Sequence, residues 1–229
     1  PSPVPGHFTV GVVADYTQAL VKKARCVVAE LDERMPATAH DALVAAGDID
    51  VWVEADVDQI LLHDSEPSNQ EREVARHVAS AIPNRATVQF GIGGLSVAVA
   101  QALRDHRDLG VHSGVVSDAL VDLIEKGVVT NAYKGFDEGV SVTGCLFGSE
   151  RLNTHADGNP TIALRAATHT HNAEIMARLH RLHSVNSAIE VDLTGQVNAE
   201  QAGSRYLGAV GGQIDFVRGA QFSPGGRSI

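Results

Sequence analysis

Residues 89–103 read QFGIGGLSVAVAQAL, and this stretch decides the fold. It joins a short apolar strand, predicted at Thr87–Phe90, to a helix predicted at Ser96–His106 through a turn rich in glycine. Glycine in such a turn permits positive φ and close approach of a ligand to the main chain. Free backbone N–H groups at the start of a helix can bind an anion or a developing oxyanion. A tight strand-to-helix turn without a ligand explains the same glycines, so the motif alone does not decide function.

Short apolar segments and helical patterns alternate along the rest of the chain. This alternation predicts βαβ units, and therefore an α/β fold with open, mainly parallel sheets. Further strands are predicted at Cys26–Leu31, Val51–Ala55, Leu109–His112, Val140–Thr143, Ile162–Ala166 and Val185–Leu193. Further helices are predicted at Asp15–Ala24, Gln70–Ala81, Val116–Lys126, Asn172–His180 and Asp215–Ala220.

A polar segment, HDSEPSN at residues 63–69, interrupts this alternation and has the composition of a linker. We therefore expect a domain boundary there. Residues 1–66 would form part of a first α/β domain, and residues 67–229 would form a second.

The composition is that of an ordinary globular protein. The chain has 229 residues, of which 44% are hydrophobic and 20% charged. No apolar run reaches the roughly 18 residues of a membrane span, and the segment PSPVPGHF does not resemble a signal peptide, so we expect a cytoplasmic protein without a membrane partner. The net charge of −10, with no clustered Lys and Arg, argues against nucleic acid as a partner. Cys26 and Cys145 lie in apolar runs and are expected to be buried free thiols.

The histidines do not predict a metal site. His169 and His171 lie in THTH, and His180 and His183 lie in HRLH, without a cysteine or carboxylate at zinc-site spacing. Dinucleotide binding is a weaker alternative for the glycine turn. Ser96 stands where the fingerprint needs its third glycine, and no acidic residue ends the following strand.

A second informative segment is SVNSAIEVDLTGQVNAE at residues 184–200. Read as a strand, it places Glu190 and Asp192 on one face, which is either solvated or lines a site because unpaired buried carboxylates are costly. Thr194 and Gly195 then form a hairpin-type turn. Further on, GAVGGQIDFVRGA at residues 208–220 contains a second glycine turn before a helical pattern, and its backbone could donate to an oxyanion.

Together these segments resemble the acetyl-CoA hydrolase and 4-hydroxybutyrate CoA-transferase family, within the class I CoA-transferases. The resemblance extends over nearly the whole chain, in the right order, and rests on several long motifs. These are HFTVGVVADYTQAL, VQFGIGGLSVAVAQAL, DLGVHSGVVSDALVDLIEKGVVTNA, NSAIEVDLTGQVNAE and VGGQIDFVRGAQFSPGGRSI.

The resemblance implies two similar open α/β domains with the acyl-CoA site between them, usually in a homo-oligomer. It implies that the first domain, and by the same argument the second, is incomplete in this chain. It also implies coenzyme A as a substrate, with no permanently bound cofactor, and an acyl-CoA with a carboxylic acid or water as reactants. The residues that match the family's CoA-contacting motifs are Gly91, Ile92, Gly93, Gly94, Leu95, Ile189, Gly211 and Gly212.

The resemblance departs from the family at the position of the nucleophile. In the family a glutamate that directly follows a His-Ser or His-Thr pair attacks the thioester and becomes a glutamyl-CoA thioester. Here the pair is His112-Ser113, and the next residue is Gly114. Glycine offers no nucleophile, so the classical transfer cannot run through this position.

Three accounts follow from that departure. In the first, the scaffold binds CoA thioesters and a water or another carboxylate acts as base for hydrolysis, with Glu190 the candidate by motif. In the second, the chain is a subunit of a heteromer whose partner carries the glutamate. In the third, the protein is a catalytically inactive CoA-binding module.

Overall fold

The computed structural model describes residues 4–38, 43–208 and 211–229, and its centre is a parallel sheet. Four strands lie in the order β16-β11-β5-β6, and all three pairings are parallel. A parallel bridge between His112 and Val142 continues this array to the β8–β10 pair, which is also parallel, as is the β7–β9 pair beside it. The strand bounds are β5 (Thr87–Gln89), β6 (Gly110–Val111), β7 (Val115–Val116), β8 (Ser141–Thr143), β9 (Cys145–Leu146), β10 (Ile162–Leu164), β11 (Leu182–Ser184) and β16 (Arg227–Ser228). The predicted α/β class with a mainly parallel sheet is confirmed.

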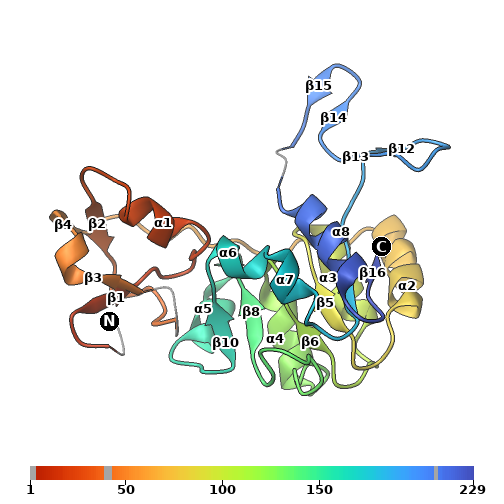
Figure 1. The fold of residues 1–229 in the computed structure, drawn as a ribbon, viewed down its shortest axis with the longest axis horizontal. Coiled ribbons are helices and arrows are strands. Elements are labelled where there is room, and N and C mark those ends of the chain that lie inside the picture. Colours follow the sequence, from red (N-terminus) through yellow and green to blue (C-terminus); the bar gives the residue numbers. More distant parts are fainter. Residues whose placement is uncertain (1–3, 39–42, 209–210) are drawn as a thin grey trace.

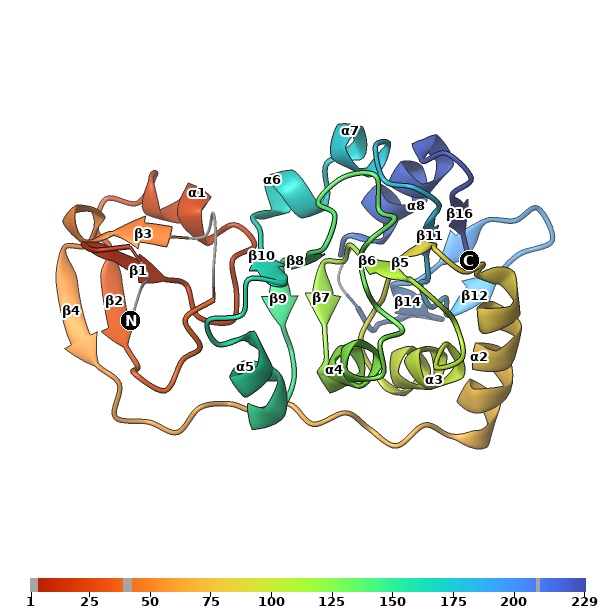
Figure 2. The same ribbon diagram turned by 90° about the horizontal axis from the view of Figure 1, so that it is seen from below.

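Helices cover both faces of this sheet (Figure 2). One layer contains α2 (Asn69–Ala81), α3 (Gly94–Ala102), α4 (Asp118–Glu125) and α5 (Glu150–Ala156). The opposite layer contains α6 (Ala167–Thr170), α7 (Ala173–Met176) and α8 (Gln213–Phe222). The main hydrophobic core includes Leu103, Leu120 and Leu152, whereas a smaller cluster around Met176 and Phe216 holds α7 and α8 in place.

Local sequence explains why α2 begins where it does. The Ser68 hydroxyl accepts from the Glu71 N–H at 3.2 Å, and the Glu71 carboxylate accepts from the Ser68 N–H at 2.7 Å, so two backbone donors of the first turn are satisfied. The stripe formed by Ala75, Val78 and Ala79 is buried against α3. This helix is therefore fixed at its start by capping and along its length by apolar packing.

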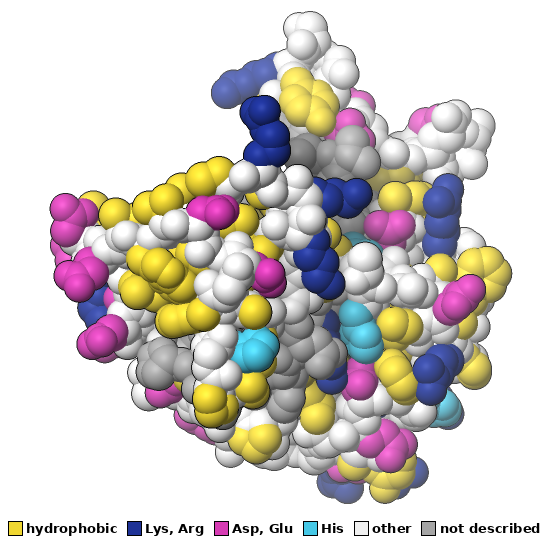
Figure 3. Space-filling model, turned by 60° about the vertical axis from the view of Figure 1, so that its left-hand side comes forward, with side chains coloured by type: hydrophobic (Ala, Val, Ile, Leu, Met, Phe, Trp, Pro, Cys, Tyr) yellow, Lys and Arg dark blue, Asp and Glu magenta, His cyan; other side chains and the backbone are white. Residues whose placement is uncertain are grey.

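The N-terminal part is built from two small sheets. β1 (His7–Thr9) pairs antiparallel with β3 (Leu43–Ala45), and β2 (Val28–Leu31) pairs parallel with β4 (Val51–Glu54). This part also contains α1 (Thr17–Val21) and a short 3-10 helix, η1 (Ala46–Asp48). Figure 3, with this part turned to the front, shows hydrophobic side chains exposed across it, and the exposed apolar residues of β2 and β4 are Val28, Leu31, Val51, Trp52 and Val53.

The linker-like segment runs along the surface of the second part. No helix or strand forms over residues 55–68, but the Asp64 carboxylate accepts from the Ala119 N–H at 3.0 Å at the start of α4. Earlier in the chain, Val13 forms an antiparallel bridge with Cys145, and Ala14 is completely buried in the main core. Part of the N-terminal segment thus packs into the second part, and the boundary between residues 66 and 67 stays a prediction.

Residues 186–208 form an arm that projects from the body between β11 and α8 (Figure 1). It contains two hairpins: β12 (Glu190–Val191) pairs with β13 (Val197–Asn198), and β14 (Gln201–Ala202) pairs with β15 (Arg205–Tyr206). The predicted turn in the first hairpin is confirmed. Gly195 has φ of +87°, and the Asp192 carboxylate accepts from the Gln196 N–H at 2.9 Å.

Several predicted elements need correction. The strand predicted at Val185–Leu193 is wrong, because the strand is β11, at Leu182–Ser184, and beyond it the neighbouring β5 gives way to the glycine turn. The helix predicted at Asn172–His180 is only α7, four residues long, capped by the Asn172 side chain. Cys26, predicted to be buried, is exposed because β2 begins two residues later and both strands of that sheet face solvent; Cys145 is buried as predicted.

Candidate functional site

The candidate site lies at the carboxyl ends of the parallel strands, where α/β sheets commonly bind ligands. The glycine turn follows β5, residues Ser113 and Gly114 follow β6, and α6 follows β10. The α8 helix brings its N-terminus to the same place. Four chain segments that are far apart in sequence therefore meet here.

The first glycine turn keeps main-chain donors available. Gly93 has φ of +91° and is the N-cap of α3, whereas the φ angles of Gly91 and Gly94 lie outside the left-handed region. Among the described residues, the N–H groups of Gly91, Ile92 and Gly93 donate to no acceptor. The Leu95 N–H faces the Glu71 carboxylate and adds to the Ser68 hydrogen bonds that hold the pKa of Glu71 below its usual range. Part of the helix N-terminus is therefore already occupied by a carboxylate of the chain itself.

Ser113 ties this turn to the end of β6. The residue is completely buried, and its hydroxyl accepts from the Phe90 N–H at 3.2 Å. The hydroxyl proton can be donated to the Val115 carbonyl at 2.7 Å or to the Phe90 carbonyl at 3.0 Å. The start of the glycine turn is therefore hydrogen-bonded to the residue that precedes Gly114.

Gly114 is anchored by its carbonyl, which accepts from the N–H groups of Gly144 and Cys145 at 3.1 and 3.0 Å. Its φ lies outside the left-handed region, so the backbone would accept a side chain. A Cβ at this position would lie 3.2 Å from both Cε1 and Nε2 of His171. The space in front of residue 114 is therefore bounded by an imidazole ring.

The same imidazole lies against the second glycine turn. A Cβ on Gly212 would overlap Nε2 and Cδ2 of His171, which no side chain tolerates without displacing the ring. Phe216, one turn into α8, meets the ring edge-on with 4.8 Å between centroids. His171 is thus held between two glycine backbones and one aromatic ring.

The carboxylates of Asp215 and Asp15 affect the pKa of the His171 imidazole. Burial lowers the pKa of His171, and the nearby Asp215 and Asp15 carboxylates oppose that shift. Asp15 has φ of +23°, an uncommon conformation for a residue other than glycine.

Burial, reinforced by Asp15, raises the pKa of the Cys145 thiol to about 11. Cys145 is therefore a neutral thiol at physiological pH and is no nucleophile.

A buried polar network lies behind the site. His112 is completely buried, its Nε2 donates to the Thr170 carbonyl at 2.9 Å, and its Nδ1 has no partner among the described residues. Lys134 is also completely buried, and Nζ donates to the Val140 carbonyl at 2.6 Å. Burial lowers the pKa of His112 to about 3 and that of Lys134 to about 7. Nearby, Asp137 pairs with His169 at 2.9 Å.

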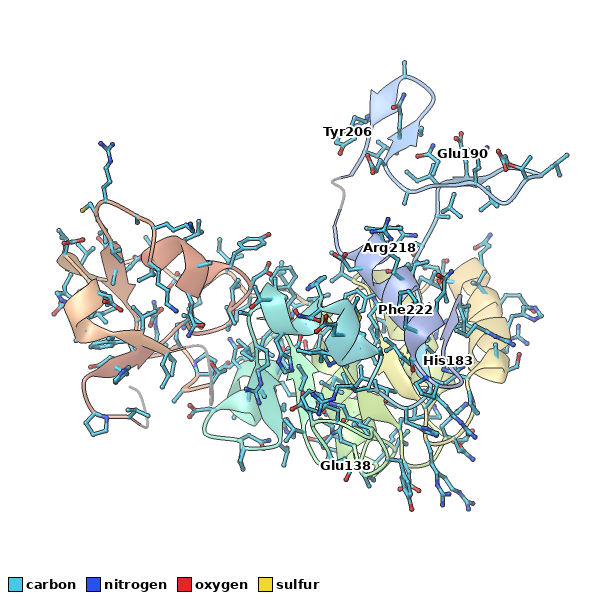
Figure 4. All side chains as sticks on the ribbon, viewed as in Figure 1. Glu138, His183, Glu190, Tyr206, Arg218 and Phe222 are labelled. Atoms are coloured by element: carbon cyan, nitrogen blue, oxygen red, sulfur yellow. The ribbon has the colours of Figure 1, made fainter. Side chains whose placement is uncertain are left out.

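The arm carries the remaining predicted residues. Glu190 and Ile189 are exposed, and Glu190 accepts from the Asn198 amide at 2.8 Å within its own hairpin. Figure 4 shows Glu190 on the arm, away from the helix that carries Arg218 and Phe222. Gly211 is exposed, with no atom within 4 Å of a Cβ built there. The structure brings together the first glycine turn, Gly114 and Gly212, but it records no contact between them and Glu190.

Sequence reasoning missed His171 and Asp15 as site residues. His171 was considered only as a metal ligand, and its contact with Gly114 arises between residues far apart in the chain. Within the described ranges, no group of three or more His, Cys, Asp or Glu side chains is arranged to hold a metal ion. No helix of the described part is long and apolar enough to cross a membrane.

Comparison with known proteins identifies relatives along the whole chain. Residues 148–229 match the family described as acetyl-CoA hydrolase/transferase C-terminal domain. A 4-hydroxybutyrate coenzyme A transferase from Clostridium kluyveri is 34% identical over 224 residues, which cover 98% of this chain and 52% of the relative.

Solved structures agree with this comparison. RipA from Yersinia pestis is 33% identical with a TM-score of 0.89, and the match covers 99% of this chain and 51% of that one. A 4-hydroxybutyrate CoA-transferase from Porphyromonas gingivalis is 32% identical with a TM-score of 0.88, and the match covers 100% of this chain and 55% of that one. The chain therefore spans about half the length of the proteins that it matches.

Proposed function

Because the chain belongs to the acetyl-CoA hydrolase and CoA-transferase family, we propose that the protein binds a CoA thioester at the carboxyl edge of its parallel sheet. It acts on a short acyl-CoA by thioester hydrolysis or by CoA transfer to a carboxylic acid. Coenzyme A is a substrate in this proposal, and no cofactor is bound permanently.

One observation carries the proposal. Ser113 joins the first glycine turn to Gly114, and His171 touches the positions of both Gly114 and Gly212. Both glycine turns and the position that the resemblance assigns to the nucleophile therefore lie in one site. Unused backbone N–H groups and missing side chains suit a ligand that approaches the main chain closely, as an acyl-CoA thioester would.

The proposed binding residues are those that matched the family motifs. Gly91–Leu95 and Gly212 line the body of the site, and Ile189 and Gly211 contribute from the arm or its base. Ile189 is 40% exposed, which leaves an apolar side chain available to a ligand or to another part of the protein. Glu190, the base expected from the sequence, serves in this proposal to order the hairpin through Asn198.

We further propose that the protein is cytoplasmic and forms a homo-oligomer or a heteromer. Both cysteines are free thiols, which suits a reducing compartment. Exposed apolar residues on β2, β4 and the arm offer surface for association. Gly114 supports two alternatives, since glycine cannot form a glutamyl-CoA thioester. The protein is then either part of a heteromer whose partner supplies a glutamate or an inactive CoA-binding module.

The test uses the full-length protein that contains this chain. Purified protein is incubated with acetyl-CoA and butyryl-CoA while free thiol is followed, with and without added carboxylic acids. We expect thiol release without an acceptor if hydrolysis is the reaction, and acyl-CoA exchange only with an acceptor if transfer is the reaction. Neither reaction, combined with saturable CoA binding, would support the inactive module.

A further inference from the structure

The imidazole of His171 lies in the place that a side chain at residue 114 would enter. The distance from the Gly114 Cβ position to Nε2 is 3.2 Å, which is within the reach of one carboxylate group. A nitrogen base thus stands where a carboxylate nucleophile would have been expected. This is a juxtaposition of residues far apart in sequence, on the loop after β6 and at the end of α6.

We propose that His171 is the general base that activates a water molecule for hydrolysis of the CoA thioester. The inference rests on the proposed CoA-thioester site and assigns its catalytic residue. It replaces covalent catalysis by a carboxylate with attack by water, and glycine at residue 114 leaves space for the imidazole that would activate this water.

The hydrogen bonds around the ring indicate which nitrogen is basic. Nδ1 lies 2.8 Å from Oγ1 of Thr170, and that hydroxyl can itself donate to the Ala166 carbonyl, 3.5 Å away. With the hydroxyl proton directed to the carbonyl, Oγ1 accepts from Nδ1–H, which leaves the lone pair on Nε2. This tautomer is assigned from the network, and it directs the basic nitrogen toward Gly114 and Gly212.

His171 is half-buried, and its Nε2 makes no hydrogen bond within the described residues. This nitrogen therefore keeps its lone pair for a proton from water. Thr170 on the Nδ1 side and Phe216 against the ring restrict its rotation, so Nε2 keeps its direction.

The charged groups around the ring suit a base at neutral pH. Burial disfavours the imidazolium, whereas Asp215 from α8 and Asp15 from the segment beside β9 favour it. Neutral imidazole is the form that accepts a proton. The two carboxylates then stabilise the imidazolium formed in the transition state.

The reaction balances with water as the only co-reactant. Nε2 takes one proton from water as the oxygen attacks the thioester carbonyl, and the carbonyl electrons move to oxygen to form a tetrahedral oxyanion. When the oxyanion collapses, the C–S bond breaks and the proton on Nε2 passes to the departing CoA sulfur. The products are a carboxylic acid, which ionises in water, and the free thiol of CoA.

Main-chain donors for the oxyanion lie beside the base. The N–H groups of Gly114 and Gly212 donate to no acceptor among the described residues. Both belong to residues whose Cβ positions approach the ring of His171. Preorganised donors of this kind contribute on the order of 100-fold or more to acyl-transfer rates.

The experiment compares His171→Gln and His171→Ala with the parent, in the full-length protein, using acetyl-CoA as substrate. Calorimetry with CoA measures binding, and free-thiol release measures turnover. We expect CoA affinity within a few fold of the parent and turnover lower by about 100-fold or more in both variants. Added imidazole should restore turnover to His171→Ala, whose cavity can admit it, and should not restore it to His171→Gln. The matched control is His77→Gln, on the exposed face of α2, which should behave as the parent.

The pH dependence of turnover distinguishes a catalytic role of His171 from a purely structural one, because a structural role would not change it. Turnover of the parent should fall as His171 is protonated at low pH, and this limb should be absent from the residual activity of His171→Gln. If CoA does not bind to the parent, the proposed function fails and the inference fails with it. If CoA binds but the parent does not hydrolyse acetyl-CoA, or His171→Gln retains turnover, the proposed function survives and the assignment of His171 is overturned.

Discussion

His171 and Gly114 are neighbours: the Cβ position of residue 114 lies 3.2 Å from the Nε2 and Cε1 atoms of the imidazole. Such a contact is tighter than ordinary packing, so a side chain at residue 114 would require the ring to shift by a few tenths of an ångström. The ring also touches the position of Gly212. Glycine at both positions therefore allows an imidazole to occupy the centre of the site.

Gly114→Glu should create CoA transfer, since it restores the carboxylate at the position indicated by the resemblance. The backbone conformation accepts a side chain, and the ring of His171 must move slightly to admit it. We expect an enzyme-bound CoA thioester, detected by intact-mass spectrometry as a CoA-sized adduct sensitive to hydroxylamine. Misplacement by about 1 Å could reduce the rate by two orders of magnitude, so adduct formation is the more sensitive readout.

Gly114→Gln is the matched control for this variant, because it has the same size and lacks the nucleophile. It should form no adduct. An adduct on the parent chain would contradict the assignment, since some other residue would then be the nucleophile.

Gly212→Val should displace His171, because a Cβ at residue 212 overlaps the imidazole. Displacing the ring removes the proposed base from the site, so we expect thiol release from acetyl-CoA to fall by about 100-fold. Gly47→Val serves as the control, since no atom lies within 4 Å of a Cβ there and the residue belongs to η1 in the N-terminal part. Equal turnover in Gly212→Val and Gly47→Val would mean that the reaction does not take place beside His171.

Glu190→Gln separates the two candidate bases. The carboxylate is exposed and accepts a hydrogen bond from Asn198, which an amide oxygen can also accept, so we expect turnover within a few fold of the parent. If Glu190 acts as the base, the same variant instead loses nearly all thioesterase activity and keeps its CoA affinity within a few fold. Observation of that loss would make Glu190 the base and would rule out His171.

Stability should decrease on acidification because two buried groups are held neutral. The pKa of Lys134 falls from 10.5 to about 7 on folding, and that of His112 falls from 6.5 to about 3. The unfolded chain therefore binds more protons than the folded chain, for Lys134 between about pH 10 and pH 7 and for His112 between about pH 6 and pH 3. The free energy of unfolding should rise with pH across both windows.

Lys134→Met tests this assignment, because it keeps an unbranched stem against Gly110 and removes the amine. Chemical denaturation at a series of pH values should show that this variant loses the rise in the free energy of unfolding above about pH 7, with the acid-side dependence retained. An unchanged alkaline slope would mean that Lys134 is not the group responsible.

The sequence predicted the elements that have strong local signals. The helix at Asn69–Ala81 was expected within one residue because its apolar stripe and capping residues are local. The glycine turn before α3 was expected for the same reason. The strand expected over Val185–Leu193 failed because alternation also occurs in exposed hairpins, such as the one that carries Glu190.

The remaining features depend on contacts between distant parts of the chain. A lysine in a loop is expected to be exposed, but Lys134 is completely buried, with the methylene groups of its side chain packed against Gly110. No local sequence pattern predicts this contact. The contact between His171 and Gly114 likewise requires the strand order, which places β6 beside β8. The sequence could therefore predict the glycine turns and could show that glycine stands at the position of the nucleophile. It could not predict that the imidazole of His171 lies beside that glycine.

The most direct test of the central claim is a calorimetric titration of the full-length protein with CoA, beside its Gly93→Val variant. Gly93 has φ of +91° and ψ of −179°, a conformation that essentially only glycine adopts and that costs other residues about 1–3 kcal/mol, so the substitution should rearrange the turn. Gly127→Val is the control, because Gly127 also has positive φ and lies after α4, away from the carboxyl edge of the sheet. The account predicts saturable binding by the parent and by Gly127→Val, and loss of binding in Gly93→Val. No heat and no competition at millimolar CoA with the parent protein would contradict it.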